Sequence, residues 1–100
     1  MPAAQFLYLT TTGRASGEPR EIEIWFTERD GRYYVIAEYE TSHWVQNLRA
    51  NPQARWRVGE QTFSGSARLL ESGAVRDAIR ELSRQKYGWG DGLVVELAPE

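Results

Sequence analysis

The chain has 100 residues, enough for one small domain, with 41% hydrophobic and 26% charged residues and a formal net charge of -2. This slightly acidic balance argues against a dedicated nucleic-acid binder, and no apolar stretch approaches the roughly 20 residues that a membrane-spanning helix needs. The absence of cysteine excludes disulfides, thiolate metal sites and cysteine nucleophiles. The first six residues, MPAAQF, lack the basic and apolar regions of a signal peptide, so we expect a single cytoplasmic domain over residues 1–100.

The first part of the chain predicts three consecutive strands. Residues 5–11 are apolar and aromatic and end in β-branched threonines. Residues 20–28 alternate, which places Ile22, Ile24 and Phe26 on one face and Trp25 on the other. The Asp-Gly pair at residues 30–31 is a strong signal for a tight hairpin turn into a strand over residues 33–39. We therefore expect an antiparallel meander.

The second part of the chain predicts two helices and three more strands. Residues 41–52 change to a helical period, with Thr41 or Ser42 as a cap and Pro52 as the stop. Residues 54–58 and 62–70 indicate strands joined at residues 59–60, with Gly65 as a candidate bulge or bend. Residues 73–88 indicate an amphipathic helix, and residues 93–99 a final strand. The apolar stripe of that helix is expected at Val75, Ala78, Ile79 and Leu82.

The order of these elements predicts a mainly β fold with two helices, in the α+β class. Short hairpin connections favour antiparallel pairing of the six strands. A small closed or partly closed barrel satisfies six strands in so short a chain, with the helices plugging or flanking its ends.

The segment TTTGRASGEPR, residues 10–20, raises the main functional question. It has neither the G-x-G-x-x-G spacing of a dinucleotide-binding turn nor the G-K-[ST] of a P-loop. Glycine-freed backbone amides, two arginines and a serine hydroxyl suit a phosphate or carboxylate, whereas a plain hairpin turn with solvated arginines explains the same residues. The candidate anion-binding residues are Gly13, Arg14, Ser16, Gly17 and Arg20.

Aromatic residues form the second notable set. Four Trp and five Tyr are many for 100 residues, and the core accounts for some of them. Trp25 lies on the glutamate-flanked face of its strand, where a ring can support a flat ligand or seat a dimer partner. Trp44 and Asn47 are three residues apart and share a helix face in this interpretation. Neither a hydrolase triad nor a metal site is indicated, and the lone His43 is expected to be an exposed helix-start residue.

Two motifs carry a resemblance to a known family. The pieces LTTTGR-x-SG-x-PR, residues 9–20, and W-x-x-NL-x-ANP, residues 44–52, resemble the F420 (deazaflavin)-dependent nitroreductase/quinone reductase family. The resemblance extends over residues 6–99 and implies a split β-barrel related to the FMN-binding, pyridoxamine-phosphate-oxidase-like barrels.

The resemblance also implies a function and a site. It implies coenzyme F420 as the cofactor and hydride transfer between reduced F420 and an organic acceptor such as a quinone or nitro compound, with a homodimer as the expected assembly. No catalytic residue is assigned. The implied cofactor-binding residues are Gly13, Arg14, Ser16, Gly17, Arg20, Trp25, Trp44 and Asn47, and the implied substrate-binding residues are Tyr87 and Trp89.

Other interpretations of the sequence stay open at this point. Ala15 stands where the family usually has a basic residue, and Glu38 and Glu40 add acidic character beyond the third strand. These departures keep FMN, heme or another ligand as alternatives within the same fold. A non-catalytic binding module of this fold, or a small nucleic-acid-binding barrel, are further alternatives.

Overall fold

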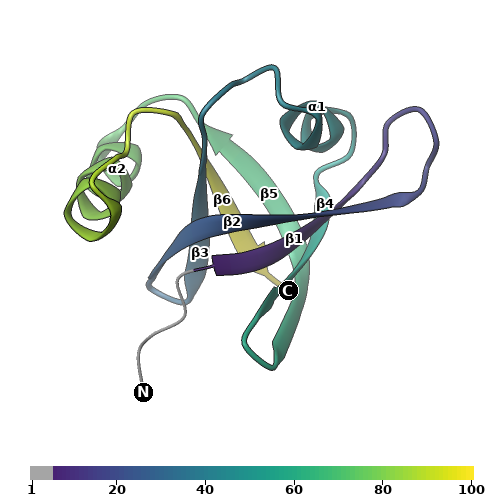
Figure 1. The fold of residues 1–100 in the computed structure, drawn as a ribbon, viewed down its shortest axis with the longest axis horizontal. Helices are drawn as coiled ribbons and strands as arrows, with labels where there is room; N and C mark the ends of the chain where they lie inside the picture. The colour runs from purple at the N-terminus through teal and green to yellow at the C-terminus, as the bar shows by residue number, and fades with distance from the viewer. Residues whose placement is uncertain (1–5) are drawn as a thin grey trace.

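The computed structural model describes residues 6–100, which form a six-stranded barrel with two helices (Figure 1). Residue Gln5 of the first predicted strand, and most of the segment used for the signal-peptide argument, lie outside the described residues. The elements in chain order are β1 (Phe6–Thr12), β2 (Pro19–Arg29), β3 (Arg32–Ala37), α1 (His43–Ala50), β4 (Gln53–Val58), β5 (Gln61–Leu70), α2 (Ala74–Tyr87) and β6 (Leu93–Pro99).

The barrel closes in the order β1-β2-β3-β6-β5-β4, and each neighbouring pair of strands is antiparallel. The predicted α+β class, the six-stranded antiparallel barrel and the order of elements are therefore confirmed. The β2–β3 turn follows from its sequence, because Asp30 and Gly31 both have positive φ, 54° and 76°, as a tight hairpin turn of this type requires.

The core fills the inside of the barrel. Alternate residues of the strands point inward, among them Leu9, Val35, Trp56 and Leu97, which are at most 1% exposed. This alternation is visible in the sequence of β2 and β4, and burial of the inward side chains is the main favourable term for a chain of this size.

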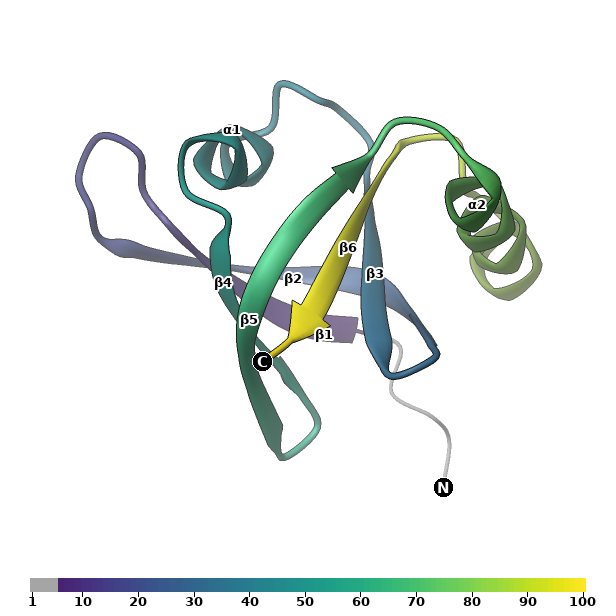
Figure 2. The same cartoon turned by 180° about the vertical axis from the view of Figure 1, so that it is seen from behind.

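The two helices lie on opposite sides of the barrel in both views (Figures 1 and 2). α1 packs against β1, and α2 packs against β2 and β6. The apolar stripe expected along α2 is only partly buried: Ile79 is fully covered, whereas Val75 and Leu82 are 43% and 39% exposed. The stripe was predicted too wide because α2 touches the barrel along a narrow line, where the small Ser83 is buried instead.

Gly65 does not mark a bulge. The pairing of β5 with β4 runs through Gly65 without a break in register, and the pairing with β6 starts at Gly65, opposite Pro99. A methyl group at this position would overlap the carbonyl oxygen of Ala98. The glycine is therefore needed for the close approach of β6 to β5.

The barrel is split along one side of β2. This strand pairs with β1 as far as Trp25, but it pairs with β3 only from Phe26 to Arg29. Within the described residues, the edge of β2 over residues 20–25 that faces away from β1 has no paired strand. The candidate site lies at this split. No helix in the described part of the chain is long and apolar enough to cross a membrane.

Candidate functional site

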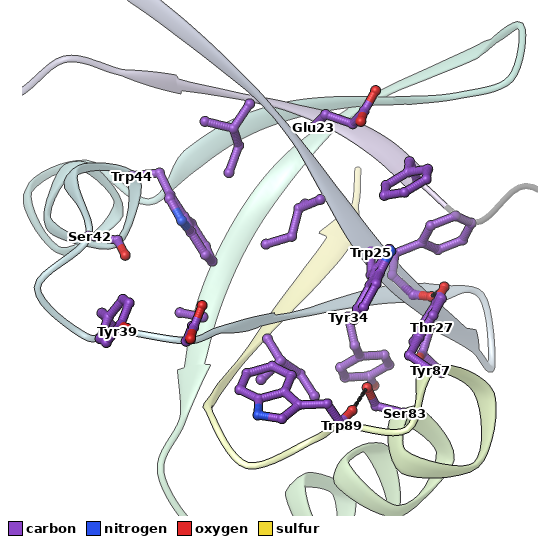
Figure 3. A pocket seen from close by; sticks show the side chains of 17 residues that line it. Glu23, Trp25, Thr27, Tyr34, Tyr39, Ser42, Trp44, Ser83, Tyr87 and Trp89 are labelled. Atoms are coloured by element: carbon purple, nitrogen blue, oxygen red, sulfur yellow. Dashed lines mark hydrogen bonds between the residues drawn. The ribbon is translucent and has the colours of Figure 1, made fainter.

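A cavity of about 640 Å³ lies between the split edge of β2, the start of α1 and the end of α2. This volume is within the range of small-molecule and cofactor sites. Its walls are mainly apolar and aromatic, and Figure 3 shows them converging from several elements. The lining residues are Phe6, Ile22, Glu23, Ile24, Trp25, Phe26, Thr27, Tyr34, Ile36, Ala37, Glu38, Tyr39, Ser42, Trp44, Ser83, Tyr87 and Trp89.

Both faces of β2 border the cavity. Ile22 and Ile24 belong to the face that packs toward the core, and Glu23 and Trp25 belong to the other. A paired strand would show only one face to such a space. Here the edge of β2 that lacks a paired strand borders the cavity, so residues from both faces of the strand reach it.

The wall on the α2 side is held in place by the end of that helix. The Tyr87 hydroxyl donates to the backbone carbonyl of Phe26 at 2.7 Å. The Tyr87 ring stacks on Trp25, with ring centroids 4.6 Å apart and planes 2° from parallel. Trp25 is still 40% exposed. The predicted position of Trp25 on the outward face is confirmed, and Tyr87 both fastens α2 to β2 and lines the cavity.

Trp89 reaches the cavity from the connection between α2 and β6 (Figure 3). Ser83 donates its hydroxyl to the carbonyl of Trp89 at 2.6 Å. Arg80 donates to the carbonyl of Gly92 at 2.8 Å, and Arg84 pairs with Asp91 at 2.9 Å. These contacts from one helix fix the short connection, and so the place of the indole before any ligand binds.

The loop between β1 and β2 projects beyond the barrel on the α1 side (Figure 1). Its backbone amides are largely used within the loop: Gly13 donates to Glu18, Gly17 donates to Gly13, and Glu18 donates to the Ser16 hydroxyl oxygen. The expectation that glycine frees these amides for an anion is wrong for these three groups, because they close the turn. The Ser16 hydroxyl keeps its hydrogen for another acceptor, and Arg20 is exposed.

Arg14 is anchored to α1. Its backbone amide and its Nη1 both donate to the Asn47 side-chain oxygen, at 3.2 and 2.9 Å. Its guanidinium also contacts His43, through the carbonyl oxygen and Nδ1, each at 3.4 Å. His43 lies between Ser42 and Trp44, two residues of the cavity. The loop arginine is thus held beside the α1 end of the cavity, and His43 is exposed at the helix start as predicted.

Asn47 does not line the cavity with Trp44. It is 3% exposed, and its amide nitrogen donates to the Thr11 hydroxyl at 3.3 Å. Trp44, by contrast, is half-buried and lies in the cavity. Trp44 and Asn47 lie three residues apart in α1, as predicted, but β1 and the loop pack against α1 at Asn47 and take up its buried amide. Asn47 joins three segments, and any contact of it with a ligand would have to run through Arg14.

The acidic residues after β3 separate in the structure. Glu38 borders the cavity, whereas Glu40 lies 3.8 Å from Arg49 at the end of α1. The cavity itself thus carries Glu23 and Glu38 on its border, and the arginines lie on the loop. A ligand with an apolar ring and an anionic tail matches this separation between an apolar cavity and a basic loop.

Tyr34, one of the notable aromatic residues of the sequence, was not predicted as a site residue, yet it is a buried part of the cavity floor. It is 4% exposed, and its hydroxyl donates to Glu96 at 3.0 Å. Burial first, and then the hydrogen bond to the Glu96 carboxylate, raise the pKa of Tyr34 above its usual value. The run RYYVIA was a usable signal, because apolar residues at both alternating positions of β3 indicate a strand that is covered on both faces.

The fold and site together define a split-barrel protein with an aromatic cofactor-sized cavity. The sequence model of the F420H(2)-dependent quinone reductase family matches residues 1–89. The chain therefore belongs to the F420H(2)-dependent quinone reductase family.

Solved structures agree with this family and with the fold. An F420-H2-dependent reductase, FDR-A, is 25% identical, with a TM-score of 0.79 and 93% of both chains covered. The heme storage protein HutZ from Vibrio cholerae is 20% identical, with a TM-score of 0.81 over 97% of this chain and 82% of that chain. A candidate pyridoxamine 5'-phosphate oxidase from Listeria innocua is 19% identical, with a TM-score of 0.79 over 96% and 84% of the two chains. The predicted resemblance and the pyridoxamine-phosphate-oxidase-like fold are confirmed.

Proposed function

We propose that this protein binds F420 with its ring system in the cavity at the split of the barrel, and that it reduces an organic acceptor such as a quinone or a nitro compound. The observation that carries this proposal is that an aromatic cavity and a loop arginine meet at the start of α1: Trp44 lines the cavity, and Arg14 is anchored to the adjacent His43 and to Asn47. When bound in its reduced form, F420 supplies a hydride.

The residues present fit such a cofactor in two respects. Trp25, Trp44 and Trp89 offer ring faces and edges to a flat heterocycle, within a volume of about 640 Å³. Arg14, Ser16 and Arg20 offer donors to an anionic tail outside the apolar cavity. Gly13 and Gly17 contribute by shaping the turn that carries these side chains.

Tyr87 and Trp89 remain proposed contacts of the acceptor. Both line the cavity on the α2 side, across from Trp44. In this proposal the protein binds the two reactants face to face and excludes water between them, which brings the reacting atoms together without a nucleophilic side chain.

We also propose a homodimer of single-domain chains. Phe6, Trp25 and Tyr39 are 40%, 40% and 64% exposed, and all three border the cavity. A second copy placed over this border would cover these side chains and enclose the ligand. Sedimentation at the mass of the 11.5 kDa monomer at micromolar concentration would contradict this arrangement. The expected cytoplasmic location is kept as part of the proposal, and cell fractionation tests it.

The activity is tested by oxidation of F420H2 in the presence of a quinone or a nitro compound. The protein is expected to restore the absorbance of oxidised F420 at a rate that depends on both acceptor and protein concentration. The variant that tests the acceptor contact is Trp89→Leu, which keeps an apolar side chain but removes the proposed contact, and which should raise the KM for the acceptor. No acceptor-dependent oxidation with any member of either class would reject the proposed reaction.

A second candidate function is FMN binding in the same cavity. The observation that favours it is the acidic border formed by Glu23 and Glu38, which would disfavour a long polyanionic tail near the ring. Tight binding of FMN with no binding of F420 would support this alternative.

A further inference from the structure

Glu96 is a buried carboxylate that the proposed function does not use. It lies in the middle of β6, and its side chain is only 5% exposed. Its neighbours Val95 and Leu97 point into the barrel core, so Glu96 points to the outer face. A charge in such a place requires partners, because an unpaired buried carboxylate is strongly unfavourable.

Two arginines and one tyrosine supply those partners. Arg68 on β5 lies 3.2 Å from one carboxylate oxygen, and Arg32 on β3 lies 3.4 Å from the other. That second oxygen also accepts the Tyr34 hydroxyl at 3.0 Å. Both arginines are more than half exposed, so the carboxylate connects a solvent-facing cationic pair with the buried Tyr34.

The strand register explains this arrangement. Thr27, Tyr34, Glu96 and Arg68 are directly paired across β2, β3, β6 and β5, so their side chains form one row on the outer face. Thr27 and Tyr34, at one end of the row, line the cavity. Arg68, at the other end, is 68% exposed. The row leads from the cavity floor to solvent across four strands.

We propose that Glu96 is a positioning residue, which holds the Tyr34 ring on the cavity floor and thereby sets how tightly a planar cofactor is bound. This inference rests on the proposed function, because it takes F420 as the occupant of the cavity. Tyr34 is otherwise held by apolar contacts with Ile79 and Val94. Such contacts hold the body of the ring, whereas a hydrogen bond to a charged acceptor fixes the position of the hydroxyl end and with it the tilt of the ring.

The alternative explanation is purely structural, in which Glu96 only joins three strands through its ion pairs. The two explanations differ in what Tyr34→Phe does. If Glu96 acts through the Tyr34 hydroxyl, removing that hydroxyl has the same effect on ligand affinity as neutralising Glu96, and the two changes together cost no more than either alone.

The test is a double-mutant cycle on equilibrium F420 binding with wild type, Glu96→Gln, Tyr34→Phe and the double variant, and Glu60→Gln as the matched control. Glu60 is exposed in the β4–β5 turn. Each single variant is expected to bind F420 about fivefold more weakly, and the double variant no more weakly than Tyr34→Phe, a coupling of about 1 kcal/mol. Glu60→Gln should bind as wild type does.

A ligand-free readout accompanies this cycle. The phenol of Tyr34 should titrate at lower pH in Glu96→Gln than in wild type, because the neighbouring negative charge is lost, and the affected transition should be absent in Tyr34→Phe. Additive losses of affinity in the cycle, or Tyr34→Phe binding F420 as tightly as wild type, would overturn the proposal. If Glu96→Gln does not fold, the affinity of Tyr34→Phe for F420 decides whether the proposal holds.

Failure of the proposed function and failure of the positioning role of Glu96 give different results in these experiments. If wild type binds FMN but not F420, the cofactor assignment fails, and the same four variants compared with FMN still decide the role of Glu96. If wild type binds neither, both statements are rejected. A cycle with unchanged affinities and normal thermal unfolding would reject the positioning role alone.

Discussion

The indole of Trp25 lies flat against the phenol ring of Tyr87, with centroids 4.6 Å apart and planes 2° from parallel. One residue belongs to the stretch of β2 that pairs with β1 but not with β3, and the other to the last turn of α2. Because β3 pairs with β2 only from Phe26 onward, this stack and the hydrogen bond from Tyr87 to the Phe26 carbonyl take over part of the contact that strand pairing would give before Phe26.

Tyr87→Phe removes that hydrogen bond and keeps the ring. We expect the free energy of unfolding to fall by about 1 kcal/mol, since the Phe26 carbonyl loses the nearer of its two side-chain donors and keeps only Lys86 at 3.4 Å. Urea unfolding measures the change. Tyr39→Phe is the matched control, because Tyr39 is 64% exposed, and its unfolding should be unchanged within about 0.5 kcal/mol. Equal effects of the two variants would argue against the anchoring role of Tyr87.

Arg14→Ala is expected to weaken F420 binding by about tenfold or more, because a charge-assisted hydrogen bond to the tail is lost. The loss should shrink as salt is added, since the contact is exposed and therefore screened. Fluorescence titration at two salt concentrations measures both effects. Arg55→Ala, an exposed arginine on β4, serves as the control and should bind F420 normally. A salt-independent loss would indicate a disturbed loop.

Asn47→Ala addresses the support of that loop. The substitution leaves the buried Thr11 hydroxyl and the Arg14 amide without their partner. We expect a loss of about 2 kcal/mol in the free energy of unfolding, which is the usual cost of unsatisfied buried polar groups. Gln46→Ala, one residue earlier on α1, should cost less, because Gln46 bonds only the exposed Glu40 carbonyl. Equal costs would contradict the joining role of Asn47.

Stability should also fall at high pH because of Tyr34. Its pKa is raised in the folded state by burial and then by Glu96, so above about pH 10 the unfolded chain loses this proton while the folded chain keeps it. Folding then binds a proton, and the free energy of unfolding decreases as pH rises. Tyr34→Phe should show a smaller decrease in the same range by urea unfolding. An unchanged pH dependence would contradict the raised pKa of Tyr34.

Gly65→Ala tests the tight approach of β5 and β6. The added methyl would overlap the Ala98 carbonyl oxygen, so backbone must shift, and we expect a loss of about 2–3 kcal/mol in the free energy of unfolding. Ser66→Ala, the exposed neighbour in the same strand, is the control and should change little. A neutral Gly65→Ala would show that the strands separate without cost.

Local signals account for what the sequence predicted well. The apolar run of β1, the alternation in β2, the Asp30-Gly31 turn and the stop at Pro52 depend on neighbouring residues, and each matches the structure. The closed barrel followed from counting short antiparallel strands. The LTTTGR and NL-x-ANP pieces of the sequence also led to the family. In the structure these two pieces contact each other through Arg14 and Asn47.

Features that depend on strand register were out of reach. The open edge of β2 exists because β3 pairs with it over only four positions, which no local pattern reveals. The row from Tyr34 to Glu96 requires the order β3-β6-β5, in which strands far apart in the sequence become neighbours. The burial of Asn47 and the narrow contact of α2 likewise depend on which elements meet.

Equilibrium titration of the purified protein with oxidised F420, with FMN in parallel, tests the central claim most directly. Ligand fluorescence and quenching of the four tryptophans, three of which line the cavity, report binding. The account predicts saturable F420 binding at micromolar concentration, with quenching reduced in Trp25→Leu and affinity reduced in Arg14→Ala. Saturation by FMN alone, or no saturation by F420 with the protein still folded, would contradict it.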